Sequence, residues 1–414
     1  MIRKNLRKIK IESVDSNFEL EPQIRPLGLK ELIWNFYMIE KKIEQLDIRP
    51  PHHDSNRLIS IDALRGLSMF FIIGGEKIFT SFSVVWPNSF TNTLAENMEH
   101  AGWEGFYFYD QIFPLFLFLV GILIPIVISR SKENGKSNKE IFFHVSKRAL
   151  VLIFLGLVNY GLLRFDWPNM RWSSVLGRIG ICYFFASVLV MYTNWRVQAY
   201  TILVILIGYW AALNFIPVPG YGPGILTPEG CLTTWLDQKI IPGKLGIGIY
   251  DRQGVLSTFT SLASTLIGVQ AGYWLRTQRT KNQKAIGLLV ASIIFLSVGW
   301  IWGRFFFISR NVWTSSFVLY TSGWSLLFMS LFYWIIEVKG FKKWTFFLVV
   351  IGMNAITIWV GQRFIDFKFT SDALFLGVSK YLGILQPIFL ALCHFMIVWL
   401  FLWFLYRKKI FLKA

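Results

Sequence analysis

Charged side chains are scarce in this chain of 414 residues, and make up 16% of it. A soluble domain carries roughly 25% charged residues. Hydrophobic residues instead make up 54%, and the mean hydropathy is +0.49. No Walker, GxGxxG, GxSxG or HExxH motif occurs in a strand–helix context. These absences argue against soluble nucleotide-binding folds, and the composition predicts a polytopic membrane protein.

Cysteine and histidine are also rare. The three cysteines are Cys182, Cys231 and Cys393, and no pair has the spacing of metal ligands. We therefore expect neither a disulfide framework nor a metal site. Of the five histidines, four lie in a polar tail, a basic loop or an apolar run. Only His100 lies in a short linker between two apolar stretches, which makes it the most informative residue.

The surroundings of His100 allow two interpretations. Glu99 and Glu104 supply carboxylates close by, and Trp103 supplies an aromatic ring. A neutral imidazole can take up a proton near pH 7 without further tuning, so His100 is a candidate catalytic base. Alternatively, His100 and Trp103 form an interfacial pair that anchors the end of a helix. The linker alone does not separate the two.

The chain contains ten apolar stretches of about 20 residues, the length that crosses a hydrocarbon core of ~30 Å. They predict an all-α polytopic membrane protein with about ten transmembrane helices. The stretches are at about 60–80, 107–129, 148–163, 175–193, 198–216, 255–275, 285–307, 314–336, 345–363 and 385–406.

Lysine and arginine are distributed unequally between the two sides of these spans. The even-numbered connections and the C-terminal tail carry 18 of them, against nine on the opposite side. Because loops rich in lysine and arginine stay on the cytoplasmic side of a membrane, both termini are expected in the cytoplasm, and His100 is expected to face outward. The net charge of +18 follows mostly from this asymmetry, so nucleic acid is not an expected partner.

Residues 1–58 precede the first span and form a predicted cytoplasmic extension, ahead of a transmembrane domain at 59–414. Residues 29–46 show helical periodicity with aromatic and lysine side chains, as in an amphipathic helix that lies along a membrane surface. A docking or anchoring element and a weakly ordered extension explain this segment equally well.

Ionisable and amide groups within or beside spans are costly and commonly mark functional sites. Asp62 and Arg65 are three residues apart, on one helix face, at the cytoplasmic start of the first span. Most of the others cluster at outer helix ends, at the level of His100. These are Asp110, Arg178, Asn311 and Ser316. Such convergence predicts an outward-facing pocket, whereas each residue taken alone fits a buried structural pair.

Ordered sequence blocks across 57–414 resemble the heparan-alpha-glucosaminide N-acetyltransferase family of transmembrane acyltransferases. The first three are the run 57–67, the His-Ala-Gly-Trp-Glu-Gly segment at 100–105 and the Asp-x-x-Phe-Pro-x-Phe segment at 110–116. The rest are 175–184, 251–258, 268–272, 311–316, 352–354 and 405–411. The resemblance fits a bacterial-type member in the cytoplasmic membrane, without the lumenal domain of the animal enzyme.

The resemblance, combined with the topology, implies an enzyme that takes an acetyl group from cytoplasmic acetyl-CoA. The acceptor is an amino or hydroxyl group of a sugar or glycan on the outer side. His100 then acts as the general base or as a nucleophile that carries the acetyl group, and Asp110 orients its imidazole. Asn311, Ser316 or Arg178 is expected to donate hydrogen bonds to the oxyanion. Asp62 and Arg65 are candidates for the CoA side.

A transporter or flippase of a glycan precursor is the alternative, because polar groups in spans also mark permeation paths. That function predicts internal repeat symmetry, and the two halves share no repeated block. Besides acetyl-CoA and an amino sugar or glycan acceptor, the expected partners are membrane lipid and a second copy of the chain in a homodimer.

Overall fold

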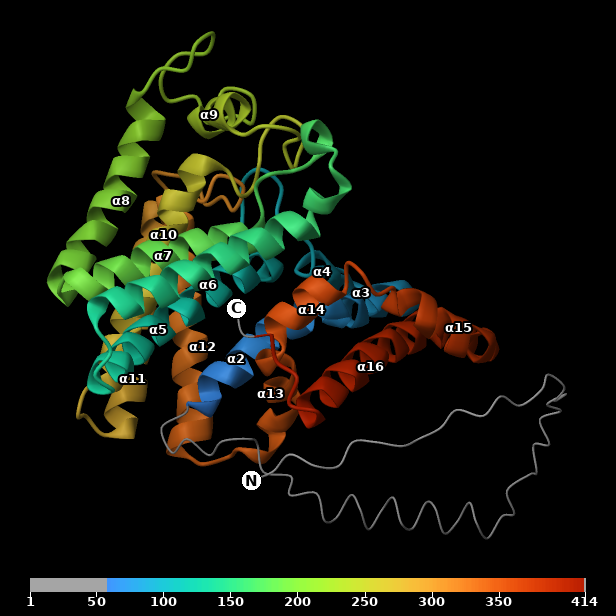
Figure 1. Ribbon diagram of the computed structural model, residues 1–414. Coiled ribbons are helices and arrows are strands. Elements are labelled where there is room, and N and C mark those ends of the chain that lie inside the picture. The colour runs from blue at the N-terminus through green and yellow to red at the C-terminus, as the bar shows by residue number, and fades with distance from the viewer. Residues whose placement is uncertain (1–57, 413–414) are drawn as a thin grey trace, which may run out of the picture. The chain divides into compact units, whose positions relative to one another are not determined.

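The computed structural model describes residues 58–412, which are helical with connecting loops and contain no β-strand (Figure 1). The predicted N-terminal extension and its amphipathic helix at 29–46 lie outside the described residues. The helices are α2 (Ile59–Phe70), α3 (Glu76–Val85), α4 (Ser89–Glu96), α5 (Ile112–Glu133), α6 (Asn138–Asn159), α7 (Val175–Tyr192), α8 (Trp195–Phe215), α9 (Leu232–Ile240), α10 (Val255–Arg276), α11 (Lys281–Trp302), α12 (Ser315–Tyr333), α13 (Phe346–Met353), α14 (Ala355–Gly361), α15 (Phe367–Ser379) and α16 (Gln386–Arg407).

The prediction of an all-α polytopic membrane protein is confirmed. Within residues 58–412, nine helical segments are long and apolar enough to cross a membrane, and a bent pair of helices raises the number to ten. The third span begins at Asn138, ten residues before its predicted start. The reason is a capping box in which Ser137 and Glu140 satisfy free backbone groups, so that the helix starts within the basic segment.

Two of the spans are broken, and the breaks lie in segments that pack together. The first span passes from α2 through a π-helical turn, Phe71–Gly75, in which Gly74 has φ +120°, and continues as α3. The ninth bends by 52° between α13 and α14, at Asn354. The backbones of α2 and α13 touch, since a Cβ on Gly66 would lie 1.9 Å from the Leu348 carbonyl oxygen.

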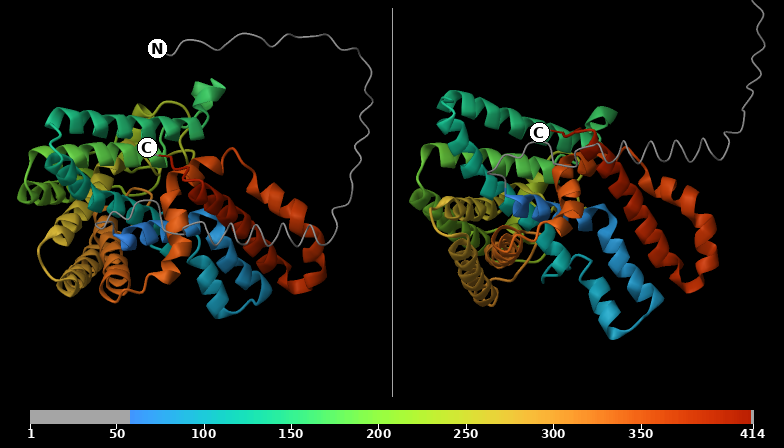
Figure 2. Two further views of the ribbon diagram at one scale, coloured as in Figure 1. Left: turned by 60° about the horizontal axis from the view of Figure 1, so that its bottom comes forward. Right: turned by 90° about the horizontal axis from the view of Figure 1, so that it is seen from below.

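The helices form two groups (Figure 1). One contains α5 to α8 and α10 to α12, and the other contains α2 to α4 and α13 to α16. In both views of Figure 2, the α3–α4 and α15–α16 hairpins extend away from the first group. The α15–α16 hairpin, which the apolar pattern did not predict, closes through ring contacts of Phe367 with Phe401 and of Phe375 with Phe389.

Glycines allow α5 and α10 to pack backbone against backbone in the first group. A Cβ on Gly121 would lie 2.0 Å from the Thr265 carbonyl oxygen, and one on Gly268 would lie 2.2 Å from that of Phe118. Small residues permit this close approach between transmembrane helices, where lipid tails are as apolar as leucine and packing drives association. Asp110 lies just before α5 and Gln253 just before α10. The close packing of these two helices therefore fixes the position of both residues.

We expect Gly121→Leu to destabilise the protein by about 1–3 kcal/mol, the usual cost of overpacking, because the backbones must separate. Gly208→Leu in α8 is the matched control, since a Cβ there meets no atom within 4 Å. Thermal unfolding of the purified protein in detergent measures both. Equal unfolding temperatures for the two variants would contradict the close α5–α10 contact.

Candidate active site

His100 lies in the loop between α4 and a short 3-10 turn, Phe108–Gln111, that precedes α5. Its Nδ1 lies 2.9 Å from Oδ1 of Asp110, which is buried in that turn. The other oxygen, Oδ2, accepts hydrogen bonds from the backbone N–H groups of Ala101 and Tyr107, both at 3.1 Å. The loop therefore folds around one buried carboxylate, which also fixes the orientation of the imidazole.

The protonation state of His100 follows from its surroundings. Burial lowers the pKa of His100 below its ordinary value, and the hydrogen bond to Asp110 offsets only part of this shift. The ring is therefore neutral at pH 7, and the contact with Asp110 is a hydrogen bond from Nδ1–H to a carboxylate. This tautomer leaves a lone pair on Nε2. Within residues 58–412, Nε2 has no hydrogen-bond partner, so it is free to take up a proton.

Arg310 is a residue of this candidate site that the sequence analysis did not single out. Its Nη1 lies 3.6 Å from Oδ1 of Asp110, on the carboxylate oxygen that faces His100. Burial lowers the pKa of Arg310 to about 10, so the guanidinium remains charged at neutral pH. The same Nη1 is buried without a hydrogen-bond partner. The available signal in the sequence is its place immediately before Asn311, although by charge alone it is one of the nine lysines and arginines expected on the outer side.

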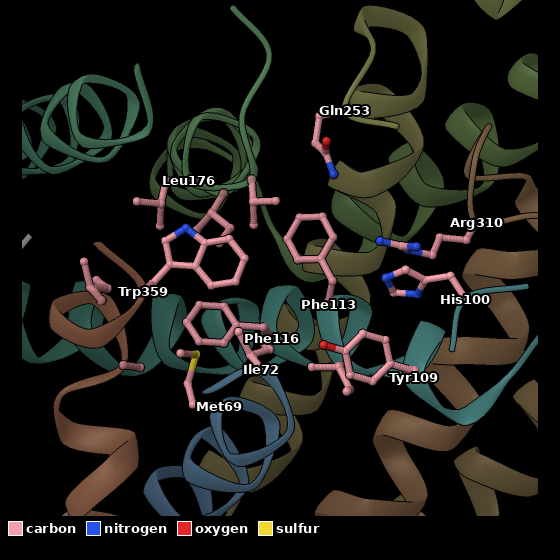
Figure 3. Close-up of a pocket in the computed structure, with 15 residues that line it drawn as sticks. Met69, Ile72, His100, Tyr109, Phe113, Phe116, Leu176, Gln253, Arg310 and Trp359 are labelled. Carbon is pink, nitrogen blue, oxygen red and sulfur yellow. The ribbon is translucent and has the colours of Figure 1, made fainter. Parts of the chain in front are cut away.

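His100 and Arg310 line a cavity of about 130 Å³ (Figure 3). Polar groups lie at one end of it and apolar side chains, among them Met69 and Trp359, at the other. The full lining is Met69, Ile72, His100, Tyr109, Ile112, Phe113, Phe116, Val175, Leu176, Ile179, Gln253, Arg310, Ala355, Ile356 and Trp359. The cavity thus lies between both helix groups, at the breaks in α2 and α13–α14.

Asn311 and Ser316, the predicted oxyanion donors, are hydrogen-bonded to backbone groups and do not line the cavity. Asn311 donates through Nδ2 to the Gly102 carbonyl, and its Oδ1 accepts from Nε of Arg252 at 3.1 Å. Ser316 donates to the Phe307 carbonyl at 2.8 Å. Asn311 thereby holds the His100 loop, and Ser316 holds the start of α12.

Arg178 is fully buried in α7, behind the aromatic wall of the cavity. Its guanidinium stacks on the Trp313 ring at 5.0 Å and donates to Oγ of Ser257. Trp313 in turn contacts the ring of Phe113, which faces the cavity. The neighbours of Arg178 in α7 reach the cavity, but Arg178 itself is not among the lining residues.

Asp62 and Arg65 lie in α2, away from this cavity. The Arg65 guanidinium is 3.8 Å from the Asp62 carboxylate, as their spacing on one helix face predicts. Trp103, which the anchor interpretation pairs with His100, donates to the Leu226 carbonyl and packs against Tyr250, in the loop before α10. His100 and Trp103 therefore contact different partners. Within residues 58–412, no group of three or more histidine, cysteine or acidic residues is arranged to hold a metal ion.

No protein-family model matches the chain. Two curated proteins are similar to it over most of its length. Human heparan-alpha-glucosaminide N-acetyltransferase is 24% identical over 422 residues, which cover 86% of this chain and 60% of the human protein. The mouse protein of the same name is 26% identical over 375 residues, which cover 75% of this chain and 54% of the mouse protein. The chain thus spans about three-fifths or less of the length of these relatives. The resemblance predicted from the ordered sequence blocks is confirmed, and the chain is a distant relative of the heparan-alpha-glucosaminide N-acetyltransferases.

Proposed function

We propose that this protein is a membrane acetyltransferase, which moves the acetyl group of acetyl-CoA to an amino or hydroxyl group of a sugar. The observation that carries the proposal is the His100–Asp110 pair at the polar end of an otherwise apolar cavity. The similarity to two N-acetyltransferases supports the reaction class. The distribution of lysine and arginine supports a cytoplasmic donor and an acceptor on the outer side of a bacterial cytoplasmic membrane.

The chemistry assigned to His100 follows from its free Nε2. As a base, Nε2 takes the proton of the acceptor while the acceptor nitrogen or oxygen attacks the thioester carbonyl. The tetrahedral intermediate then expels the CoA thiolate, and the imidazolium donates that proton to the thiolate. As a nucleophile, Nε2 attacks the carbonyl itself and the CoA thiolate leaves, so that the imidazole carries the acetyl group. The acceptor nitrogen or oxygen then attacks this acetyl group, the bond to Nε2 breaks, and the proton of the acceptor passes to the CoA thiolate. Both routes require the tautomer in which Nδ1 carries the proton and donates a hydrogen bond to Asp110, because Nε2 must be unprotonated.

We assign the neighbouring groups by what they face. Asp110 orients His100 and stabilises the imidazolium that forms during proton transfer. Arg310 lines the cavity beside His100, and we assign to its charged guanidinium the stabilisation of the oxyanion of the intermediate. Asn311 and Ser316 are positioning residues, which act through the loops that they hold. Arg178 supports the aromatic wall.

Replacing His100 by glutamine tests the proposal directly. His100→Gln keeps a polar side chain of similar size but removes the titratable nitrogen, so stability should stay near that of the wild type. Acetyl transfer should fall by roughly 10²–10⁴-fold, the usual cost of losing general acid–base catalysis. The assay combines membranes that contain the protein, labelled acetyl-CoA and a panel of amino sugars.

His144→Gln is the matched control, because His144 is exposed on α6 and is not among the residues that line the cavity. It should leave the rate unchanged. Transfer by His100→Gln within a few-fold of the wild type would remove His100 from catalysis and favour the anchor interpretation.

The pH dependence of kcat/KM reports the protonation of His100 in the free enzyme. Because its pKa lies below 6.5, the base form dominates at neutral pH, and activity should be level there and decline as His100 is protonated at lower pH. The Asp110 carboxylate raises this pKa. Asp110→Asn should therefore lower the plateau and move the acidic decline to still lower pH. A decline that moves to higher pH in Asp110→Asn would contradict the assigned pair.

Binding of the donor can be measured without turnover. Acetyl-CoA should raise the unfolding temperature of the purified protein, since a ligand at 100 times its Kd stabilises by about 2.7 kcal/mol. If the CoA side lies near the start of α2, Arg65→Gln should reduce this shift. Lys239→Gln, an exposed cation in α9, should not. No shift at saturating acetyl-CoA, or equal effects of both variants, would contradict the assignment of the donor side.

A further inference from the structure

Three successive residues in the loop before α10 contact three different parts of the molecule. Asp251 accepts hydrogen bonds from Nε and Nη2 of Arg171, at 2.8 and 2.6 Å. Gln253 lines the cavity that contains His100 (Figure 3). Arg252, between them, donates from Nε to Oδ1 of Asn311 at 3.1 Å. Of these three side chains, Arg252 is the one whose charge the contacts so far leave unexplained.

The half-buried guanidinium of Arg252 has no carboxylate partner. Within residues 58–412, Arg252 forms no ion pair. The adjacent carboxylate of Asp251 is buried, and it accepts from the backbone N–H groups of Gly246 and Gln253, each at 2.8 Å, as well as from Arg171. Removing a charge from water without a partner is costly, so a cation in this state points to a role at the site beside it.

The amide of Asn311 is held from both sides. Its Nδ2 donates to the Gly102 carbonyl, and its Oδ1 accepts from Arg252. Because a guanidinium can only donate and a carbonyl can only accept, the amide has one orientation. Without the donor of Arg252, the amide is free to turn over and place its oxygen against the Gly102 carbonyl, where the two oxygens repel. Arg252 thus keeps the Asn311 donor directed at the His100 loop.

The remaining bonds to this loop come from the same segment before α12. The backbone N–H of Gly105 donates to the Ile308 carbonyl at 2.8 Å, and Oγ of Ser309 donates to the Trp103 carbonyl at 2.6 Å. The Asn311 amide is the third of these bonds, and it is the one that reaches the loop before α10 through Arg252. The position of the imidazole therefore depends on both loops.

The charged and titratable groups that face the imidazole come from three segments. They are Tyr109 and Asp110 in the turn before α5, Arg310 in the loop before α12, and Arg252 in the loop before α10. Burial lowers the pKa of His100, Asp110 raises it, and the cations of Arg310 and Arg252 lower it. One carboxylate thus offsets two cations, and formation of the imidazolium adds a third positive charge.

We infer that Arg252 is a positioning residue of this site, which orients the amide that holds the His100 loop and supplies a second cation near the imidazole. The inference rests on the proposed function, because it assigns Arg252 to the reaction at His100. The two parts of the role use different features of the side chain. Nε holds Asn311, and the charge of the whole guanidinium opposes protonation of His100 and keeps it in its base form.

Two substitutions separate these parts. Arg252→Gln keeps an N–H donor at the place of Nε but removes the charge. Arg252→Lys keeps the charge, at the place of Cζ, but puts a methylene group at the place of Nε. Nitrogen NMR of the full-length, histidine-labelled protein in detergent follows the protonation of His100 without either substrate. We expect the midpoint to move to higher pH in Arg252→Gln, because the imidazolium loses a repelling cation, and to stay near the wild-type value in Arg252→Lys.

Turnover separates the same variants in the opposite way. In the assay with labelled acetyl-CoA and amino sugars, Arg252→Lys should lower kcat by roughly ten- to a hundredfold with little change in KM. This is the loss expected when a hydrogen bond to a charged group is expressed fully in the transition state. Arg252→Gln should lower kcat less, and its acidic decline in kcat/KM should move to higher pH, opposite to that of Asp110→Asn.

A combined variant tests the route through the amide. If Arg252 acts through Asn311, then Arg252→Lys combined with Asn311→Ala should lower kcat no further than Asn311→Ala alone. Arg304→Gln is the control for charge, because Arg304 is an exposed arginine after α11 whose guanidinium stacks on the Trp300 ring at 4.5 Å. It should leave both the His100 midpoint and kcat unchanged.

Three outcomes would each overturn the inference. A His100 midpoint that stays or moves to lower pH in Arg252→Gln would remove the cation from the imidazole. Additive losses for Arg252→Lys and Asn311→Ala would remove the route through the amide. Lower unfolding temperatures in both Arg252 variants, with the midpoint and kcat unchanged, would show a bond that only stabilises the fold. Failure of the proposed function is distinct, since it would appear as undiminished acetyl transfer by His100→Gln.

Discussion

The buried carboxylate of Asp110 is the group on which the site depends. Burying a charge is costly unless it is hydrogen-bonded and paired, and Asp110 meets this demand by drawing three segments together. The His100 imidazole and two backbone N–H groups donate to it, and the Arg310 guanidinium lies opposite. The fold of the loop, the tautomer of the histidine and the position of the arginine therefore share one physical cause.

The cavity owes its position to broken helices. In a bilayer, interrupted helices are tolerated where the freed backbone groups are buried in protein or line a cavity. The π-helical turn after α2 and the bend between α13 and α14 both occur beside the cavity that His100 lines. The glycine contacts between α5 and α10 hold the opposite wall. The same breaks border a second cavity, through Ile73 and Trp359.

The sequence predicted the helical membrane architecture because about 20 consecutive apolar residues leave few alternatives in a bilayer. It also singled out His100 and Asp110, which the structure joins by a hydrogen bond. It missed the early start of α6, where local capping by Ser137 outweighed the apolar pattern. It missed Arg310 because a basic residue in a loop looks the same whether it faces water or a buried carboxylate. Asn311 stood out for its place at the level of His100, but only the fold shows that its amide holds the backbone of the His100 loop.

The central claim is that burial keeps His100 neutral and that Asp110 holds the proton on Nδ1, which leaves a free lone pair on Nε2. Nitrogen NMR of protein labelled at histidine tests it most directly, since protonated and unprotonated ring nitrogens resonate far apart. The difference between the wild-type and His100→Gln spectra identifies the His100 signals. Near neutral pH, the account predicts a protonated Nδ1 and an unprotonated Nε2. A proton on Nε2 in place of Nδ1, or a doubly protonated ring, would contradict it.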